Sequence, residues 1–311
     1  MTILGVSEET LAGSLAPKLA LLRAVAEEGN LTRAAATVGV PQPTASRWLA
    51  MVSTELGTPV VVPDGRGIRL TRAGAYLADA ADRALSVLAA GVRQTIDEGD
   101  PEHGHVVLAF MHTLGDHLVP ELLRAFRRDH PHVRFSLMLG PHEALLDHVR
   151  SGRADLALTA PLPGPGEFAG ITLQDQQLVI TVPTEHRLAG RARMRMADLA
   201  RETTVGMKPG YGLRQITDEL AEAAGFVPTL AFEGDNLDTL RGMIAAGLGV
   251  AVLPAAEPTP RPGTVEIPLR PKETRRIGLV WAADRPLAPA ALAFRDFVSS
   301  GTEASVGRKS H

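Results

Sequence analysis

Apolar residues recur every three or four positions through the first hundred residues, which is the spacing of helices with one buried face. This pattern predicts helices over residues 16–28 and 31–38, a third helix that begins near Gln42 or Pro43, and a much longer one after Thr71. From residue 104 onward, short β-branched runs alternate with helical stripes. We therefore expect a mainly helical first third of the chain and an α/β remainder.

A tight turn separates the second and third predicted helices. Asn30 can cap the second helix by accepting a backbone N–H bond, and Gly39 can adopt the left-handed conformation that ends it. Pro41 and Pro43 then fit only at or before the first turn of the third helix. This arrangement is a helix-turn-helix, whose second helix presents its first residues to base edges in the DNA major groove. The alternative is an ordinary helical hairpin with a solvated polar end.

A β-hairpin is predicted next, because two β-branched runs within residues 58–74 flank Asp64-Gly65-Arg66-Gly67. Such a hairpin can act as a wing that touches phosphate. Trp48 is expected to pack inward, although its ring could instead press on a thymine methyl group. The helix starts and the wing give the candidate DNA-binding residues: Thr32, Arg33, Gln42, Pro43, Thr44, Ser46, Arg47, Trp48, Arg66 and Arg69.

The composition limits the possible classes of function. A net charge of −3 is unusual for a chain that is wholly a DNA-binding module, but it fits a small basic head on a larger neutral-to-acidic body. The chain has no cysteine, which excludes disulfides and thiol catalysis and leaves only histidine and carboxylate ligands for zinc. The sequence shows neither a membrane-spanning apolar run nor a secretory signal, so we expect a cytoplasmic protein.

The sequence lacks the motifs of common enzyme classes. It contains no HExxH, no GxSxG, no GxxxxGK[ST], and no GxGxxG that follows a strand and opens a helix. The phrase GLGVAVLP at residues 247–254 follows a predicted helix and enters a strand, which reverses the dinucleotide-binding order. We therefore expect no enzymatic activity, no cofactor and no metal.

The chain resembles the LysR-type transcriptional regulators over nearly its whole length. The resemblance rests on AEEGNLTRAAATVGVPQPTASRWL at residues 26–49, on GRGIRLTRAG at residues 65–74, and on FRRDHPHV, SGRADLAL and AAGLGVAVLP further on. The sequence departs from the family's usual residues at Pro41, Ala50, Met51, Val61 and Pro63. Because basic residues are common at some of these positions, their loss removes possible phosphate contacts.

The resemblance implies a DNA-binding transcriptional regulator that is controlled by a small-molecule effector. It also implies linker helices that pair two subunits, and a homotetramer formed as a dimer of dimers. The predicted pairing seam consists of Leu77, Ala81, Leu85, Leu88 and Val92. The alternative function is a soluble small-molecule binding protein that does not engage DNA.

The expected fold is a winged helix-turn-helix and a long linker helix, followed by an effector domain with two α/β lobes like those of periplasmic binding proteins. The expected boundaries are 1–75 for the DNA-binding domain, 76–100 for the linker helix, 101–300 for the effector domain, and 301–311 for a disordered tail. Within the effector domain, lobe I comprises 101–161 and 266–300, and lobe II comprises 162–265.

Ligands of such lobes bind at the carboxyl ends of strands, where helix N-termini present N–H groups. The resemblance places Thr113 at the usual effector position. Lys208 and Arg214 could pair with a carboxylate, and His112 or His142 could add a charge-assisted bond, so we expect an anionic effector. The alternative is that Thr113 only caps a helix and the cations are solvated. The candidate effector residues are Met111, His112, Thr113, Pro141, His142, Lys208, Tyr211, Arg214, Asp235 and Asn236.

Overall fold

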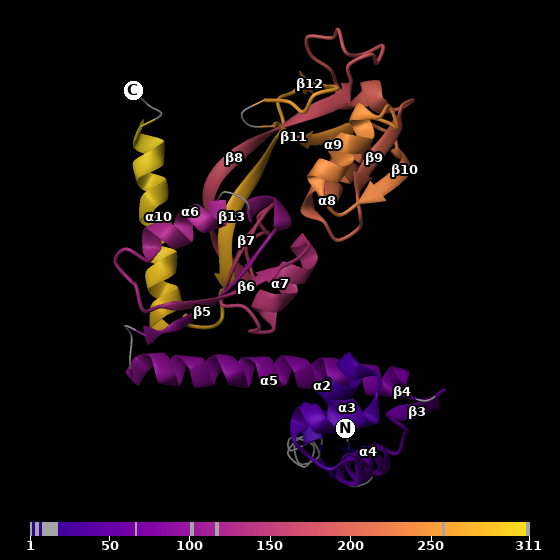
Figure 1. Ribbon diagram of the computed structural model, residues 1–311, viewed down its shortest axis with the longest axis vertical. Coiled ribbons are helices and arrows are strands. Elements are labelled where there is room, and N and C mark those ends of the chain that lie inside the picture. The colour runs from indigo at the N-terminus through magenta and orange to yellow at the C-terminus, as the bar shows by residue number, and fades with distance from the viewer. Residues whose placement is uncertain are drawn as a thin grey trace. The chain divides into compact units, whose positions relative to one another are not determined.

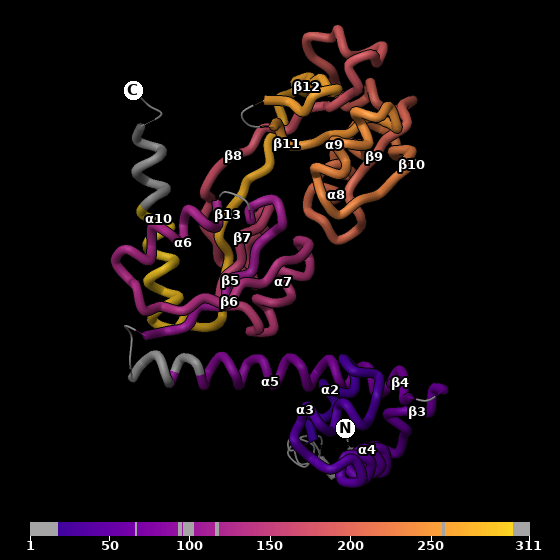
Figure 2. Tube along the Cα trace, in the orientation of Figure 1, coloured from indigo at the N-terminus to yellow at the C-terminus, as the bar shows by residue number. Residues whose placement is uncertain are grey.

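The computed structural model describes residues 2–3, 6–7, 18–65, 67–99, 103–115, 118–256 and 259–308 (Figures 1 and 2). Arg66, which we expected at the tip of the wing, lies outside these residues. The chain forms two compact units, one of residues 1–92 with 151–153 and the other of residues 93–150 with 154–311. No helix in the described part of the chain is long and apolar enough to cross a membrane.

The first unit contains the predicted helix-turn-helix and wing. A core of small and branched side chains holds them together, with Leu21, Leu22, Ala34, Ala45 and Val52 at most 1% exposed. The apolar spacing seen in the sequence therefore marks the faces that are buried. The elements are β1 (Thr2–Ile3), β2 (Val6–Ser7), α2 (Leu19–Glu28), α3 (Leu31–Val38), α4 (Gln42–Leu56), β3 (Val61–Asp64) and β4 (Gly67–Leu70).

Helix α5 (Arg72–Gly99) begins where we expected a long helix to begin, immediately after Thr71. The hydroxyl of Thr71 accepts a bond from the Gly74 N–H at 3.0 Å and donates to the Pro59 carbonyl at 2.7 Å. This cap joins the start of α5 to the head. The cap at Thr71 sets the first residue of the helix. The helix therefore begins at Arg72, within the expected DNA-binding domain and before residue 76, the expected start of the linker.

The predicted pairing seam of α5 divides into two parts. Ala81 is 1% exposed in the core of the head, and Leu77 packs against the same core. Leu88 and Val92 remain 64% and 51% exposed. Apolar residues spaced three and four apart indicate that one face of a helix is buried. The spacing does not show whether the helix's own domain or a partner subunit covers that face. Only the later part of the seam is therefore free to meet a second subunit.

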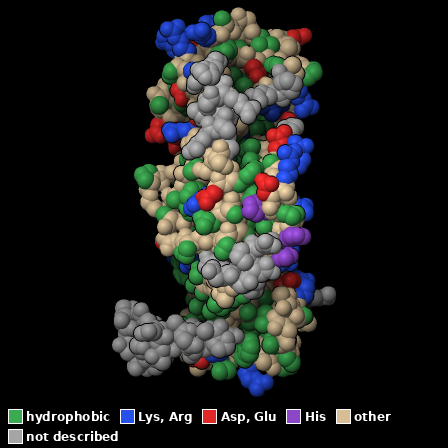
Figure 3. Space-filling model, turned by 90° about the vertical axis from the view of Figure 1, so that its left-hand side faces the viewer, with side chains coloured by type: hydrophobic (Ala, Val, Ile, Leu, Met, Phe, Trp, Pro, Cys, Tyr) green, Lys and Arg blue, Asp and Glu red, His purple; other side chains and the backbone are tan. Residues whose placement is uncertain are grey.

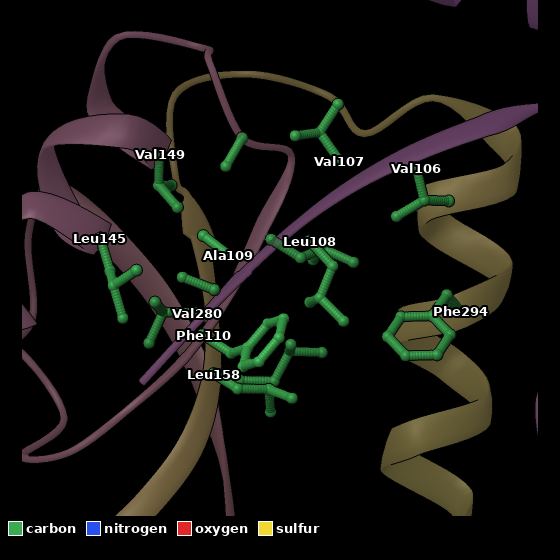
Figure 4. Close-up of a cluster of buried hydrophobic side chains, with 14 of the residues drawn as sticks. Val106, Val107, Leu108, Ala109, Phe110, Leu145, Val149, Leu158, Val280 and Phe294 are labelled. Carbon is green, nitrogen blue, oxygen red and sulfur yellow. The ribbon is translucent and has the colours of Figure 1, made fainter. Parts of the chain in front are cut away.

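Lobe I of the second unit is a sheet covered by helices. Parallel strands β6, β5 and β7 lie side by side, and β13 is antiparallel to β7. Figure 4 shows Phe294 of α10 on one side of β5, and Leu145 and Val149 of α7 on the other. Burial on both faces explains the continuous apolar run of β5. The elements are β5 (His105–Phe110), η3 (His112–Leu114), α6 (Leu118–Phe126), β6 (Arg134–Leu139), α7 (His142–Arg150), β7 (Leu156–Thr159), β13 (Thr274–Ala282) and α10 (Pro289–Arg308).

Lobe II is built around a second core, in which Leu178, Ile180, Leu240 and Ile244 are fully buried. Strands β9 and β10 are parallel, and β11 and β12 both pair with the end of β8. Each strand–helix alternation that we predicted for this region is present. The elements are β8 (Phe168–Pro183), η4 (Met196–Leu199), β9 (Thr203–Met207), α8 (Gly212–Ala223), β10 (Thr229–Gly234), α9 (Leu237–Ala245), β11 (Ala251–Pro254) and β12 (Thr264–Pro268).

The crossings between the lobes occur later in the chain than we expected. Residues 168–177 of β8 still pair with β13 in lobe I, and residues 178–183 pair in lobe II. Strand β12 likewise belongs to lobe II up to Pro268. The expected crossings at residues 161 and 266 were therefore wrong. Proline and glycine at 161–166 mark a loop before β8, and the loop does not change lobes.

Helix α10 also differs from the expectation, because it continues to Arg308 where we predicted a disordered tail from residue 301. Gly301 alone costs a helix only about 1 kcal/mol relative to alanine, and no proline follows it.

On the face shown in Figure 3, acidic and basic side chains are interspersed, as on an ordinary globular surface.

Candidate functional sites

The first turn of α4 presents polar side chains outward. The amides of Thr44 and Ala45 bond the Pro41 carbonyl at 2.9 and 3.1 Å, which starts the helix. Ala45 is fully buried, whereas Gln42 and Arg47 are exposed. Pro43 and Ser46 are also exposed, and Thr44 is half-buried. The burial of one face of α4 therefore leaves the expected recognition residues free to meet a ligand.

Trp48 behaves as expected, since it is half-buried and packs against the core of the head. Helix α3 is capped by Asn30, whose Oδ1 accepts bonds from the amides of Thr32 and Arg33 at 3.0 and 3.1 Å. Both of these residues are exposed. The Arg33 Nε also lies 2.8 Å from Glu28 Oε2, so a phosphate would have to compete with that carboxylate.

The wing carries another exposed cation, Arg69. In the β3–β4 hairpin, Arg69 pairs in register with Val62, and its Nε lies 3.9 Å from Asp64 Oδ2. Both side chains of this ion pair are 66% exposed. An exposed pair of this kind is weak. Arg69 can therefore turn toward a phosphate at little cost.

Two connected hollows lie between the lobes of the effector domain. The smaller has an accessible volume of about 20 Å³ and the larger about 560 Å³, and both are lined by His112, Thr113, Leu237 and Arg275. We call them together the interlobe cleft. The carboxyl end of β5 and the start of α9 supply opposite walls of it. This is the position expected for a ligand of open α/β lobes.

Seven of the ten candidate effector residues line this cleft: Met111, His112, Thr113, His142, Tyr211 and Asp235 the smaller hollow, and Asn236 the larger. Pro141, Lys208 and Arg214 line neither hollow. The Lys208 Nζ lies 2.8 Å from Asp235 Oδ2, and this hydrogen bond raises the pKa of Lys208. The charge of Lys208 is therefore already paired with Asp235.

Arg214 is turned into lobe II. Its Nε lies 2.8 Å from Asp218 Oδ2, and its Nη1 lies 2.5 Å from Glu233 Oε1. Burial by itself lowers the pKa of Arg214, but the bonds to Glu233 and Asp218 outweigh burial and raise it. Arg214, which we expected to bind an effector, is therefore already ion-paired with Asp218 and Glu233.

His142 and Asn236 have structural partners within the cleft. His142 is 5% exposed, its Nδ1 lies 2.7 Å from Thr159 Oγ1, and burial lowers its pKa. It is therefore held in the neutral form and does not supply the charge we expected. The Asn236 Oδ1 accepts bonds from the amides of Asp238 and Thr239, which caps α9.

Sequence reasoning missed Arg275, which both hollows share. It is 3% exposed, and its Nε donates to Gln176 Oε1 at 2.8 Å. Burial first, and then the charge of Arg241, lowers its pKa to about 10. No carboxylate in the described part of the chain forms an ion pair with it. The signal was present in β13, where Arg275 and Ile277 occupy buried positions and Arg276 an exposed one.

Two further polar atoms of the cleft lack partners among the described residues. The Thr113 Oγ1 and the Arg241 Nε are both buried without a hydrogen bond. The other nitrogens of Arg241 are engaged, with Nη2 donating to the Pro254 carbonyl at 2.9 Å and Nη1 lying 3.5 Å from Asp238 Oδ1. Buried polar atoms without partners are uncommon in native proteins. These two atoms are therefore available to form hydrogen bonds with a ligand in the cleft.

Comparisons with known proteins identify the same two parts. Residues 17–75 match the family of bacterial regulatory helix-turn-helix proteins of the lysR family, and residues 99–302 match the LysR substrate binding domain. The chain is 32% identical over 284 residues to the uncharacterized HTH-type transcriptional regulator YybE of Bacillus subtilis, covering 91% of this chain and 97% of that protein.

Two other proteins support the match. The transcriptional dual regulator GltC of Bacillus subtilis is 33% identical over 258 residues, which cover 81% of this chain and 86% of GltC. The structure of a full-length OxyR variant from Pseudomonas aeruginosa aligns with a TM-score of 0.62 and 25% identity, covering 91% of this chain and 94% of that one. The chain belongs to the LysR family, and it is a DNA-binding transcriptional regulator with an effector-binding domain of two α/β lobes.

Proposed function

We propose that the effector of this regulator is a small organic anion, held in the interlobe cleft by Arg275 with Thr113 beside it. The observation that supports the proposal most strongly is the buried guanidinium of Arg275, which has no carboxylate partner among the described residues. Burying a charge is costly unless it is paired. An anionic ligand would supply that partner.

The charges of the cleft favour a ligand with one anionic group. Asp235, Asp238 and Glu121 lie on its walls. Lys208 pairs with Asp235 and Arg241 with Asp238, while the exposed Arg261 lines the larger hollow with Glu121. Arg275 is the buried cation left over by this pairing within the described walls. The hydroxyl of Thr113 can donate a second bond to the same anion.

The remaining walls of the smaller hollow favour an apolar body on that anion. Met111 and Met207 line it together with Leu213 and Leu237. The smaller hollow has an accessible volume of only about 20 Å³, so the body of the ligand would extend into the larger hollow, whose accessible volume of about 560 Å³ is in the range of small-molecule sites. An aromatic or branched aliphatic carboxylate satisfies both conditions.

A redox signal carried by a thiol does not fit this chain. A relative from Escherichia coli O6:H1, 30% identical over 273 residues, is named a hydrogen peroxide-inducible genes activator. This chain contains no cysteine, so no thiol oxidation can set its state. Reversible binding of a ligand is the switch that the cleft supports.

At the DNA, we propose that Gln42 and Arg47 read base edges while Arg69 holds phosphate. Thr32, Arg33, Pro43 and Ser46 are exposed and Thr44 is half-buried at the starts of the two helices, and we propose that they contribute further contacts to DNA. Exposed cations and amides at the start of the second helix suit the major groove. A regulator that acts on chromosomal DNA works in the cytoplasm, and its role requires no catalysis.

A thermal-shift screen tests the effector assignment. Small aromatic and aliphatic carboxylates would be measured with the wild type, Arg275→Met and the matched control Arg276→Met, since Arg276 is the exposed neighbour on the same strand. A ligand at about a hundred times its dissociation constant stabilises by about 2.7 kcal/mol. We expect that stabilisation in the wild type and the control and its loss in Arg275→Met. Equal shifts in all three proteins would contradict the assignment.

A further inference from the structure

The two lobes touch each other at one end of the interlobe cleft. The amide of Glu143, in the first turn of α7 of lobe I, donates to the carbonyl of Gly210 in lobe II at 3.2 Å. The first amides of a helix have no partner within the helix. A carbonyl of lobe II therefore completes the start of a lobe I helix. Gly210 has a φ of 85°, a conformation that other residues rarely adopt.

The backbones come still closer at Gly212, the first residue of α8. A Cβ atom at this position would lie 1.9 Å from the Ala160 carbonyl oxygen and 2.8 Å from Pro161 Cδ. Real contacts of Cβ atoms are essentially never shorter than 3.0 Å. Ala160 is fully buried and Gly212 is buried as well. Only glycine permits this approach of α8 to lobe I.

The smaller hollow adjoins this contact. Tyr211, Gly212 and Leu213 line it from lobe II, and His142, the neighbour of Glu143, lines it from lobe I. Arg275 also lines it, from β13, near the point where the covalent crossing between the lobes occurs. The hollow is therefore bounded by the strand crossing and by the Gly210–Gly212 contact.

We propose that Glu143, Ala160, Gly210 and Gly212 form an interlobe clasp that holds the cleft closed before an effector binds, and that Gly212 is the positioning residue that sets the separation of its walls. The functional meaning of the clasp rests on the proposed effector site. The larger hollow, which shares Thr113 and Arg275, is then the route of entry.

A preformed cleft has a direct consequence for affinity. A ligand that need not close the lobes avoids the cost of ordering them. A side chain at Gly212 would force α8 away from Ala160 by more than an ångström, because 1.9 Å must become at least 3.0 Å. Such a change would separate Thr113 and Arg275 from the walls supplied by lobe II.

Distance measurement between two spin labels tests the clasp without any ligand. The native chain has no cysteine, so Arg124→Cys on α6 and Glu222→Cys on α8 label one exposed site in each lobe. Full-length labelled protein would be diluted with unlabelled protein to suppress distances between subunits. We expect one narrow distance distribution for the ligand-free protein, and a longer, broader one after Gly212→Leu.

The matched control is Gly190→Leu, because a Cβ at Gly190, which is also in lobe II, meets no atom within 4 Å. It should leave the distribution unchanged. A broad distribution in the ligand-free wild type, or identical distributions in the two glycine variants, would overturn the proposal.

Hydrogen exchange supplies an independent readout on the wild type, in case Gly212→Leu does not fold. The Glu143 amide should exchange at least tenfold more slowly than its intrinsic rate in the ligand-free protein. Exchange at the intrinsic rate would overturn the clasp. Failure of the carboxylate screen would not alter these ligand-free measurements, so the two proposals fail separately.

Discussion

The head and the interlobe cleft use arginine in opposite ways. In the head, Arg47 and Arg69 are exposed, and water solvates their charges until DNA arrives. In the cleft, Arg275 is 3% exposed and has already lost that water. A solvated cation contributes little on its own and is screened by salt. A desolvated cation without a partner raises the free energy of the folded state until an anion binds.

This difference separates two kinds of recognition. On the proposed assignment, DNA binding by the head is spread over many weak contacts at exposed side chains, and we expect each to be dispensable for folding of the domain. In the proposed site, effector binding in the cleft is concentrated on one buried group, whose loss should affect both affinity and stability. Four substitutions distinguish these two patterns.

The largest effect is expected for Arg275→Met. Ligand affinity should fall at least a hundredfold, while the unliganded protein should become more stable by about 1–3 kcal/mol, because a buried charge is replaced by an apolar chain. The pKa of Arg275 is lowered to about 10, so the folded protein releases this proton before the unfolded chain does. The unfavourable charge is thus fully present below pH 10 and disappears only as the pH rises further.

Urea unfolding at pH 6 and pH 9 measures this gain, which should be the same at both values. Arg276→Met, on the exposed side of the strand, should change stability by less than about 0.5 kcal/mol. If Arg275→Met lowers the stability of the unliganded protein, the buried charge of Arg275 does not destabilise the fold. That result would contradict the difference proposed between the arginines of the cleft and those of the head.

Gln42→Ala should have the next largest effect, on base choice. The loss of one side chain that reads a base edge costs about 1–3 kcal/mol on the preferred sequence and much less on random DNA. Fluorescence anisotropy with both DNAs separates these effects. Equal losses on the two sequences would remove Gln42 from the base-reading surface.

His142 should give the cleft a pH response that the head lacks, since all ten histidines lie at or after residue 103. Burial lowers its pKa, so the unfolded chain takes up a proton in mild acid before the folded protein does. Stability from this group is present above the ordinary histidine pKa and is lost as the pH falls below it. Between pH 7.5 and 5.5, His142→Asn should lose less stability than the wild type, by on the order of 1 kcal/mol. Equal losses in chemical denaturation would show that His142 accepts its proton in the folded state.

Arg69→Ala should have the smallest and least selective effect. Binding to all DNA sequences should weaken alike, and the slope of log affinity against log salt should fall by about one unit. Anisotropy between 50 and 200 mM salt would measure it. An effect confined to one sequence would mean that Arg69 reads a base and does not hold phosphate.

The sequence predicted the head well because its determinants are local. Asn30, Gly39 and Pro43 lie within a few residues of the helix ends that they define. The apolar spacing of α4 also identified the buried positions Ala45 and Val52. Short-range rules of capping and periodicity were sufficient for these features.

The cleft was predicted only in part because distant segments assemble it. The ends of strands located His112, Thr113 and Asp235, since strand order brings such ends together. The bond between Arg275 and Gln176 joins residues 99 positions apart, and no local pattern specifies it. Likewise, Arg214 is at a helix start of the expected kind, but its carboxylate partners turn it into lobe II.

Calorimetric titration of the carboxylate that gives the largest thermal shift tests the central claim most directly. It would be carried out with the wild type and with Arg275→Met, each in the absence and presence of operator DNA. We predict that DNA changes the wild-type affinity by a factor that corresponds to about 1–3 kcal/mol, and that the ligand changes DNA affinity by the same factor. Arg275→Met should show no measurable binding. Unchanged binding in Arg275→Met, or the same wild-type affinity with and without DNA, would contradict the account.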